Sequence, residues 1–179
     1  MSENIIKDVT DWIKNFVEVP HPLWGNLPPC PYARQARVES GKLAIRVQDQ
    51  RGYFFFIENQ IEIFKEGEFD VIVAVANKWI NPNKYTRFID QMNRELDEIV
   101  LLTDHPDILE NNNGVNVQQG EHVLTFIQNG KILEQSSKFL HETTDYYDKW
   151  DSDFYKTVVL DRYKTLHSGE PFPEWMKQK

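Results

Sequence analysis

The single cysteine of the chain, Cys30, lies in a proline-rich stretch that favours a reactive thiol. Pro28 and Pro29 keep the incoming chain extended, and a residue before a proline is disfavoured in helical geometry. Cys30 therefore fits the N-cap of a short helix, with Pro31 at its first position. The free N–H groups and the dipole at such a helix start stabilise a thiolate, so the sequence predicts a nucleophile at Cys30.

Three side chains that follow Cys30 complete this candidate site. Arg34 and Arg37 come within two helical turns of the sulfur, and we expect them to hold an anionic substrate. Tyr32 is expected to donate a hydrogen bond to that substrate. In the alternative interpretation, Cys30 is a buried, inert residue and the arginines lie on a solvated helix face.

A second candidate cluster, Asp104-His105-Pro106-Asp107, follows the apolar run 99–102. Sites in open α/β sheets gather at the carboxyl ends of strands. We expect His105 to act as an acid or base there, with Asp104 in the substrate-binding set. The alternative is an ordinary polar turn. Because no second histidine stands at ligand spacing, the cluster alone does not predict a metal site, and a metal-dependent enzyme at His105 stays open as a third alternative.

A row of potential ligands on the long helix expected over 132–150 is interpreted as a solvated face. Its members are Glu134, His141, Asp145 and Asp148. Ile132 and Phe139 belong to the stripe on the opposite side, which we expect to be buried. Glycine-rich phosphate loops, paired Cys-x-x-Cys motifs and zinc-protease signatures are absent from the sequence. We therefore predict neither a metal nor a cofactor.

Composition limits the class of protein. The 179 residues are 40% apolar and 13% aromatic, which indicates a globular fold. A net charge of -8 argues against direct binding to nucleic acid or to an anionic membrane. With one cysteine, an internal disulfide is excluded. The sequence has no apolar run of membrane-spanning length and no signal-peptide start, so we expect a cytoplasmic protein.

Hydrophobic periodicity predicts one α/β or α+β domain over 1–179, with a mostly buried central sheet of about four strands flanked by helices. Residues 1–150 form its core, and 151–179 add a C-terminal helix and an irregular tail. Two buried strands are expected on either side of a helix that begins after Asn81, as in a βαβ crossover. Helices are predicted over 5–17, 30–40, 54–64, 82–96, 132–150 and 152–166, and strands over 42–48, 69–76, 98–103 and 122–128; a strand is the alternative for 53–56.

The chain resembles a bacterial family of unknown function that carries a Cys-Pro-Phe-Ala motif and a later His-Pro motif. The matching positions are Trp12, Cys30-Pro31-Tyr32-Ala33, the strands 43–47 and 71–75, and His105-Pro106. The family supplies no activity, but the resemblance implies that Cys30 and His105 share one surface. A thiol beside an imidazole would form a nucleophile with its base.

These observations support two hypotheses of different kinds. In the first, the protein is a thiol-dependent enzyme that acts on a small anionic molecule through Cys30 and His105, assisted by the side chains Tyr32, Arg34, Arg37 and Asp104. Thiol transfer, acyl transfer and peroxide chemistry all stay open. In the second, a non-catalytic acidic protein binds a basic protein partner through the aromatic and acidic segment 146–155. The sequence predicts no oligomeric state.

Overall fold

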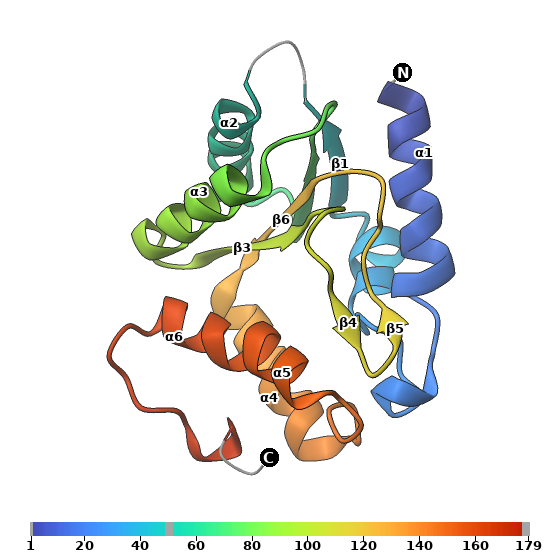
Figure 1. Ribbon diagram of the computed structural model, residues 1–179, viewed down its shortest axis with the longest axis vertical. Coiled ribbons are helices and arrows are strands. Elements are labelled where there is room, and N and C mark those ends of the chain that lie inside the picture. The colour runs from blue at the N-terminus through green and yellow to red at the C-terminus, as the bar shows by residue number, and fades with distance from the viewer. Residues whose placement is uncertain (1, 49–51, 177–179) are drawn as a thin grey trace.

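A four-stranded mixed sheet lies at the centre of the computed structural model, which describes residues 2–48 and 52–176 (Figure 1). Its strand order is β1-β2-β6-β3, with β1 and β2 parallel and β6 antiparallel to both of its neighbours. The predicted α/β class with about four central strands is confirmed. The strands are β1 (Leu43–Val47), β2 (Val71–Val75), β3 (Ile99–Asp104) and β6 (Leu124–Asn129).

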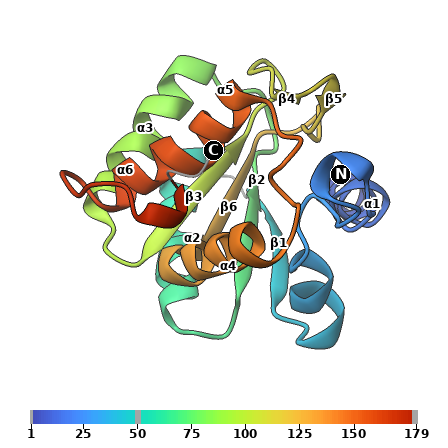
Figure 2. The ribbon, with the colours of Figure 1, turned by 90° about the horizontal axis from the view of Figure 1, so that it is seen from below.

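Helices cover both faces of the sheet (Figure 2). α2 and α3 pack on one face and α1 on the other, whereas α4, α5 and α6 form a further layer at the end of the sheet. Among the described residues, no helix is both long and apolar enough to cross a membrane. The bounds are α1 (Ser2–Trp12), α2 (Tyr53–Lys65), α3 (Pro82–Glu95), α4 (Gly130–Thr143), α5 (Ser152–Tyr155) and α6 (Arg162–Leu166).

The crossover through α3 is present but wider than a simple βαβ unit. Asn81 is the N-cap of α3, and its side chain accepts a hydrogen bond from the Lys84 N–H at 3.1 Å. β2 and β3 run in the same direction, as the crossover requires, but β6 pairs between them. The buried strands are therefore predicted correctly, while the insertion of β6 depends on long-range pairing that apolar runs do not specify.

A buried hydroxyl network joins α2 and α3 to β6. The Tyr85 hydroxyl donates to the Leu124 carbonyl at 2.6 Å and lies 2.8 Å from the Thr125 hydroxyl. The Tyr53 hydroxyl donates to the Ala74 carbonyl at 2.7 Å. These bonds satisfy polar groups that would otherwise weaken the core, so the network fixes both helices on the sheet.

The opposite face of the sheet is divided between α1 and the C-terminal layer. Val9 of α1 and Ile13 of the π-helical turn that follows it pack with Val73 of β2. Leu102 of β3 pairs with Phe126 of β6, and cross-strand partners share a face, so Leu102 also points to the α1 side. Phe126 is only partly buried in the α1 cluster. The β3 half of this face therefore remains for the C-terminal helices.

The C-terminal layer differs from its prediction at the end of α4. The helix stops at Thr143 rather than near Trp150, and Thr144 adopts an extended conformation. The following turns carry Tyr146 and Tyr147 into an aromatic cluster with Trp24. Gly25 of the proline-rich loop has a φ of +63°, and a Cβ there would lie 2.9 Å from the backbone carbon of Asp145. Only glycine fits this close approach of two loops.

The buried side of α4 is also the reverse of the predicted one. Ile132 and Phe139 are 63% and 57% exposed. His141 instead lies among aromatic rings, with its centroid 5.8 Å from that of Tyr147 and 5.7 Å from that of Trp175. The prediction of a fully solvated row is therefore wrong for His141, because the C-terminal segment packs on this face of the helix.

Candidate functional site

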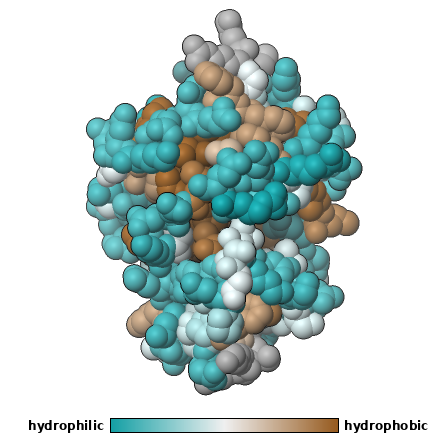
Figure 3. Space-filling view, turned by 90° about the vertical axis from the view of Figure 1, so that its left-hand side faces the viewer, coloured by the Kyte–Doolittle hydropathy of each residue, from teal (hydrophilic) through white to brown (hydrophobic). Residues whose placement is uncertain are grey.

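A cleft of about 1290 Å³ lies between the sheet and the C-terminal helices, and its lining reaches Thr86 and Ile89 of α3 as well as the α1-side face of the sheet. Its walls come from distant parts of the chain, including Trp12, Cys30, Asp104, Trp150 and Arg162. Seen from the α3 side, hydrophobic residues gather around a hollow between two hydrophilic halves of the surface (Figure 3). A large, mainly apolar cleft with a few converging polar groups is the usual form of a small-molecule site.

Cys30 lines this cleft in a tight turn before a short helix. Its N–H donates to the Val17 carbonyl at 3.1 Å, and its carbonyl accepts from the Ala33 N–H at 3.2 Å. The helix begins at Ala33, two residues later than the predicted start. Burial raises the pKa of the Cys30 thiol, and hydrogen bonds from the backbone N–H groups of Tyr32 and Ala33 oppose this effect without overcoming it. The predicted amide donors are therefore present, but the expected lowering of the thiol pKa is wrong.

The two predicted anion-binding arginines lie outside the cleft lining. Arg37 donates from Nε and Nη2 to the Glu18 carboxylate, both at 2.7 Å, and the Glu18 side chain is only 5% exposed. This bidentate pair joins the end of the first helix to the segment after Cys30. Arg34 is exposed to solvent. Of the three side chains predicted to assist Cys30, only Tyr32 lines the cleft.

His105 serves the fold rather than the cleft. It is 1% exposed, and its Nε2 lies 2.9 Å from the Ile80 carbonyl. Its Nδ1 accepts a hydrogen bond from the Asp107 N–H at 3.0 Å, so the proton belongs on Nε2. Both ring nitrogens are thus committed to backbone groups. His105 does not line the cleft as Cys30 does, and the expected pairing of the two is not found there.

A pair of buried carboxyl groups lies in the cleft instead. Asp104 is 4% exposed, and its Oδ2 accepts from the Gln119 N–H at 2.7 Å. Its Oδ1 is buried and has no hydrogen-bond partner in the described part of the chain. Burial raises the pKa of Asp104 to about 6. Burial, and then the charge of Asp104, raise the pKa of Glu110 to about 7.

Glu110 was missed in the sequence because only the fold brings it beside Asp104. The small hairpin formed by β4 (Asn111–Asn112) and β5 (Val115–Asn116) follows it directly. In the sequence this segment has only the composition of a polar turn. A pair of carboxyl groups with pKa values near neutrality can exchange protons with a bound ligand, which makes it a candidate for acid–base work.

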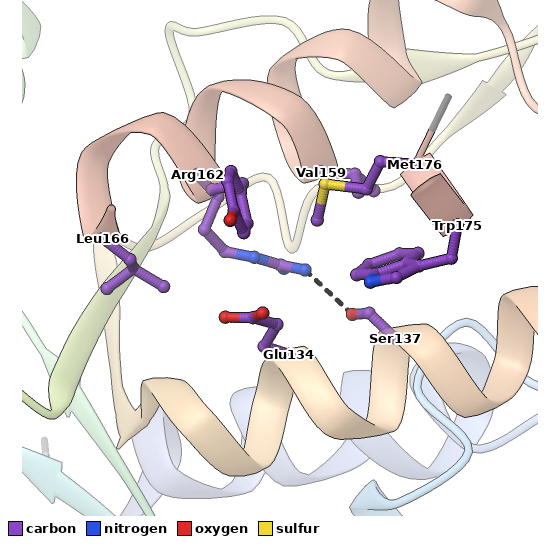
Figure 4. A pocket seen from close by; sticks show the side chains of 8 residues that line it. Glu134, Ser137, Val159, Arg162, Leu166, Trp175 and Met176 are labelled. Carbon is purple, nitrogen blue, oxygen red and sulfur yellow. Dashed lines mark hydrogen bonds between the residues drawn. The ribbon is translucent and has the colours of Figure 1, made fainter. Parts of the chain in front are cut away.

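Arg162 is the desolvated cation of the cleft, whose lining also includes the exposed Lys65. Its Nη2 donates to the Ser137 hydroxyl at 2.9 Å, and the Glu134 carboxylate faces it across a cavity of about 10 Å³ (Figure 4). Glu134 is itself bound by His167 Nε2 at 2.6 Å. Desolvation lowers the pKa of Arg162, opposed by the nearby tyrosines and Glu134. No carboxylate of the described residues forms an ion pair with this guanidinium.

Two tyrosines connect Arg162 with Cys30. The Tyr146 hydroxyl donates to the Pro29 carbonyl, next to Cys30. Burial raises the pKa of Tyr146 well above its ordinary value; a charge on Cys30 raises it further and Arg162 lowers it. The pKa of Tyr147 responds to the same two groups, after burial and a hydrogen bond with Ser137. Both phenols stay neutral, and because Tyr146 already donates its proton to Pro29, its hydroxyl offers a ligand only acceptor lone pairs.

The predicted partner surface over 146–155 has three internal tyrosines, whereas its acidic residues Asp148 and Asp153 are exposed. Tyr146, Tyr147 and Tyr155 are only 4%, 4% and 6% exposed, because they pack against one another and against the proline-rich loop. These three tyrosines therefore join the proline-rich loop to the last helices. Their contribution is to build one wall of the cleft.

Three π-helical turns lie on segments that line the cleft. They span Ile13–Val17, Gln35–Glu39 and Lys156–Asp161. Phe16, Ala36 and Asp161 from these turns all contribute to the lining. π-Helical turns are rare and are frequent at functional sites, so their position supports the assignment of the cleft as the site.

Comparison with known proteins adds no relative: no family model, curated protein or solved structure matches the chain. The resemblance to the Cys-Pro-Phe-Ala family stays a prediction. The function is therefore inferred from the geometry of the cleft.

Proposed function

We propose that the protein binds a small organic anion in the cleft and acts on it through Cys30. The observation that carries this proposal is the convergence of a thiol, two neutral phenols, a guanidinium and two carboxyl groups on one cleft. These groups come from five separate segments of the chain. Titratable side chains with perturbed pKa values in a cleft are typical of functional sites.

Arg162 is the proposed contact for the anionic group. A desolvated guanidinium without a paired carboxylate is energetically costly, and an anion from outside would compensate its charge. Its five donors are only partly used by Ser137 Oγ, and Tyr147 offers a further hydroxyl nearby. The fork of donors suits a carboxylate or phosphate.

The cleft has apolar walls and hydrogen-bond donors without partners. These features favour a ligand whose body is aromatic or otherwise apolar. Trp12 and Trp150 line the cleft, and their indole Nε1 atoms are buried without a hydrogen-bond partner among residues 2–48 and 52–176. Asp104 Oδ1 is likewise buried without a hydrogen-bond partner among these described residues. Buried polar atoms are nearly always satisfied, so these three are proposed to meet groups of the bound molecule.

Chemistry at Cys30 requires removal of its proton after the ligand binds, because the thiol is neutral in the free protein. The two backbone N–H groups at the sulfur then stabilise the thiolate. Asp104 and Glu110, with pKa values of about 6 and about 7, are the proposed proton acceptors of the cleft. The carboxyl pair thus takes the acid–base role that was predicted for His105.

Two disulfide reagents, one anionic and one neutral, test the proposed contact between Arg162 and the anionic group. Because Cys30 is the only cysteine, its reaction rate can be read directly. We expect Arg162→Gln to slow the reaction with the aromatic anion dithiobis(nitrobenzoate) by roughly tenfold, the effect of one charged hydrogen bond. The rate with neutral dithiodipyridine should change little. In the wild type, the rate with the anionic reagent should saturate as its concentration rises.

Arg34→Gln is the matched control, since it removes the same charge from an exposed position closer to Cys30 along the chain. We expect it to leave the preference for the anionic reagent unchanged. A larger effect of Arg34→Gln than of Arg162→Gln would favour the arginines predicted from the sequence and would refute the role proposed for Arg162.

A further inference from the structure

The segment that leads into β6 brings two potential metal ligands to a third on α1. Glu121 and His122 lie in this segment, and Asp8 lies on α1; the segment runs beside the helix (Figure 1). One carboxylate oxygen of each acid and one ring nitrogen of His122 all lie within 4.8 Å of one another. The three residues are outside the lining of the cleft, so the cluster is independent of the proposed function.

His122 faces this cluster through Nε2, which is paired there with the Asp8 carboxylate. Its Nε2 is shielded from solvent and has no hydrogen-bond partner in the part of the chain that the structure describes. It faces Asp8 Oδ2 at 3.5 Å, and the His122 side chain is only 18% exposed. A desolvated imidazole nitrogen facing a carboxylate needs either a proton or a metal ion between the two atoms.

The spacing fits a metal ion. Zinc binds imidazole nitrogen and carboxylate oxygen at about 2.0–2.2 Å, which puts neighbouring tetrahedral ligands about 3.4 Å apart. The 3.5 Å between Asp8 Oδ2 and His122 Nε2 agrees with this. The loop is also held in place, because Gln119 Oε1 accepts hydrogen bonds from the N–H groups of Glu121 at 2.9 Å and His122 at 2.7 Å. A site that is fixed before binding needs little rearrangement.

We propose that Asp8, Glu121 and His122 bind a divalent transition-metal ion. One imidazole and two carboxylates suit zinc and its neighbours in the first row. Three protein ligands leave at least one coordination position for water. The ion joins α1 to the segment before β6, and binding should therefore stabilise the folded protein.

Zinc itself is the probe. Untagged, metal-free protein is titrated with Zn²⁺ against a chromogenic chelator, and Co²⁺ absorption reports the ligand field. We expect one saturable zinc site per chain and a higher unfolding temperature with zinc. His122→Asn and Asp8→Asn should each weaken binding by at least about tenfold, because each removes a direct ligand. Neither variant should gain stability from zinc.

His167→Asn is the control. This histidine also lies between two carboxylates, but it meets Glu134 through Nε2 at 2.6 Å and Glu170 through Nδ1 at 3.7 Å. Opposite ring nitrogens cannot hold one ion together with both acids, so the variant should bind zinc as the wild type does. Absence of saturable binding, unchanged affinity in His122→Asn and Asp8→Asn, or binding lost only in Cys30→Ser would each overturn the proposal.

Discussion

His105→Ala should lower the free energy of unfolding by about 3 kcal/mol. The substitution removes a fully buried ring and leaves the Asp107 N–H and the Ile80 carbonyl without partners. It also removes a ring contact with Tyr85, whose centroid lies 5.8 Å away. Because the substitution removes both buried volume and two hydrogen bonds, its loss of unfolding free energy should lie at the upper end of the range for single substitutions. Chemical denaturation measures the effect.

His105→Asn separates the two hydrogen bonds. An asparagine oxygen can still accept from the Asp107 N–H, as in a common side-chain turn, but it cannot reach the Ile80 carbonyl. We expect roughly half of the loss seen with alanine. If His105→Ala retained the wild-type free energy of unfolding within about 0.5 kcal/mol, the structural role assigned to this histidine would be contradicted.

Glu110→Gln should stabilise the protein progressively as the pH rises from about 5 to about 8. Burial and Asp104 raise the pKa of Glu110 from 4.5 to about 7, so the folded state binds a proton that the unfolded chain releases. Stability therefore falls as the pH rises through this range. A glutamine stays neutral and avoids the loss. We expect a relative gain of about 2 kcal/mol at the upper end, below the full value of the shift because Glu110 is partly exposed.

The sign of this effect is its most specific feature. Denaturation curves at several pH values give the difference between the variant and the wild type, which removes contributions common to both proteins. Glu68→Gln is the control, because the Glu68 side chain is exposed and the substitution should show no comparable slope. A difference between Glu110→Gln and the wild type that stays constant with pH would refute the raised pKa.

Local signals in the sequence were sufficient for most elements. Asn81 and Pro82 fix the start of α3, and the apolar run ending at Ala76 gives β2, because caps and periodicity act over a few residues. The path of α4 was harder to predict. Ile132 and Phe139 form an apolar stripe, yet the C-terminal segment packs on the side of His141. Which face is buried depends on a partner that follows much later in the chain.

The site was predicted only in part for the same reason. Cys30 and Tyr32 line the cleft, and Asp104 lies there as expected. Arg37 carries the predicted type of charge, but the Glu18 carboxylate binds it first, and no local pattern links those two positions. Arg162 is the desolvated cation of the cleft instead of Arg37. It lies in a predicted helix whose sequence carried no sign of a functional residue. Arg162 and Cys30 come to the same cleft only through tertiary structure, and their positions in the sequence do not predict this.

The central claim is that Cys30 and Arg162 serve one ligand. Its most direct test is a crystal structure of the mixed disulfide between Cys30 and thionitrobenzoate, an aromatic acid that stays attached to the sulfur. We predict that the ring lies between Trp12 and the aromatic wall of the C-terminal layer, with its carboxylate directed toward Arg162. A ring directed into solvent, with the Arg162 side chain unmoved and the cleft empty, would contradict the account.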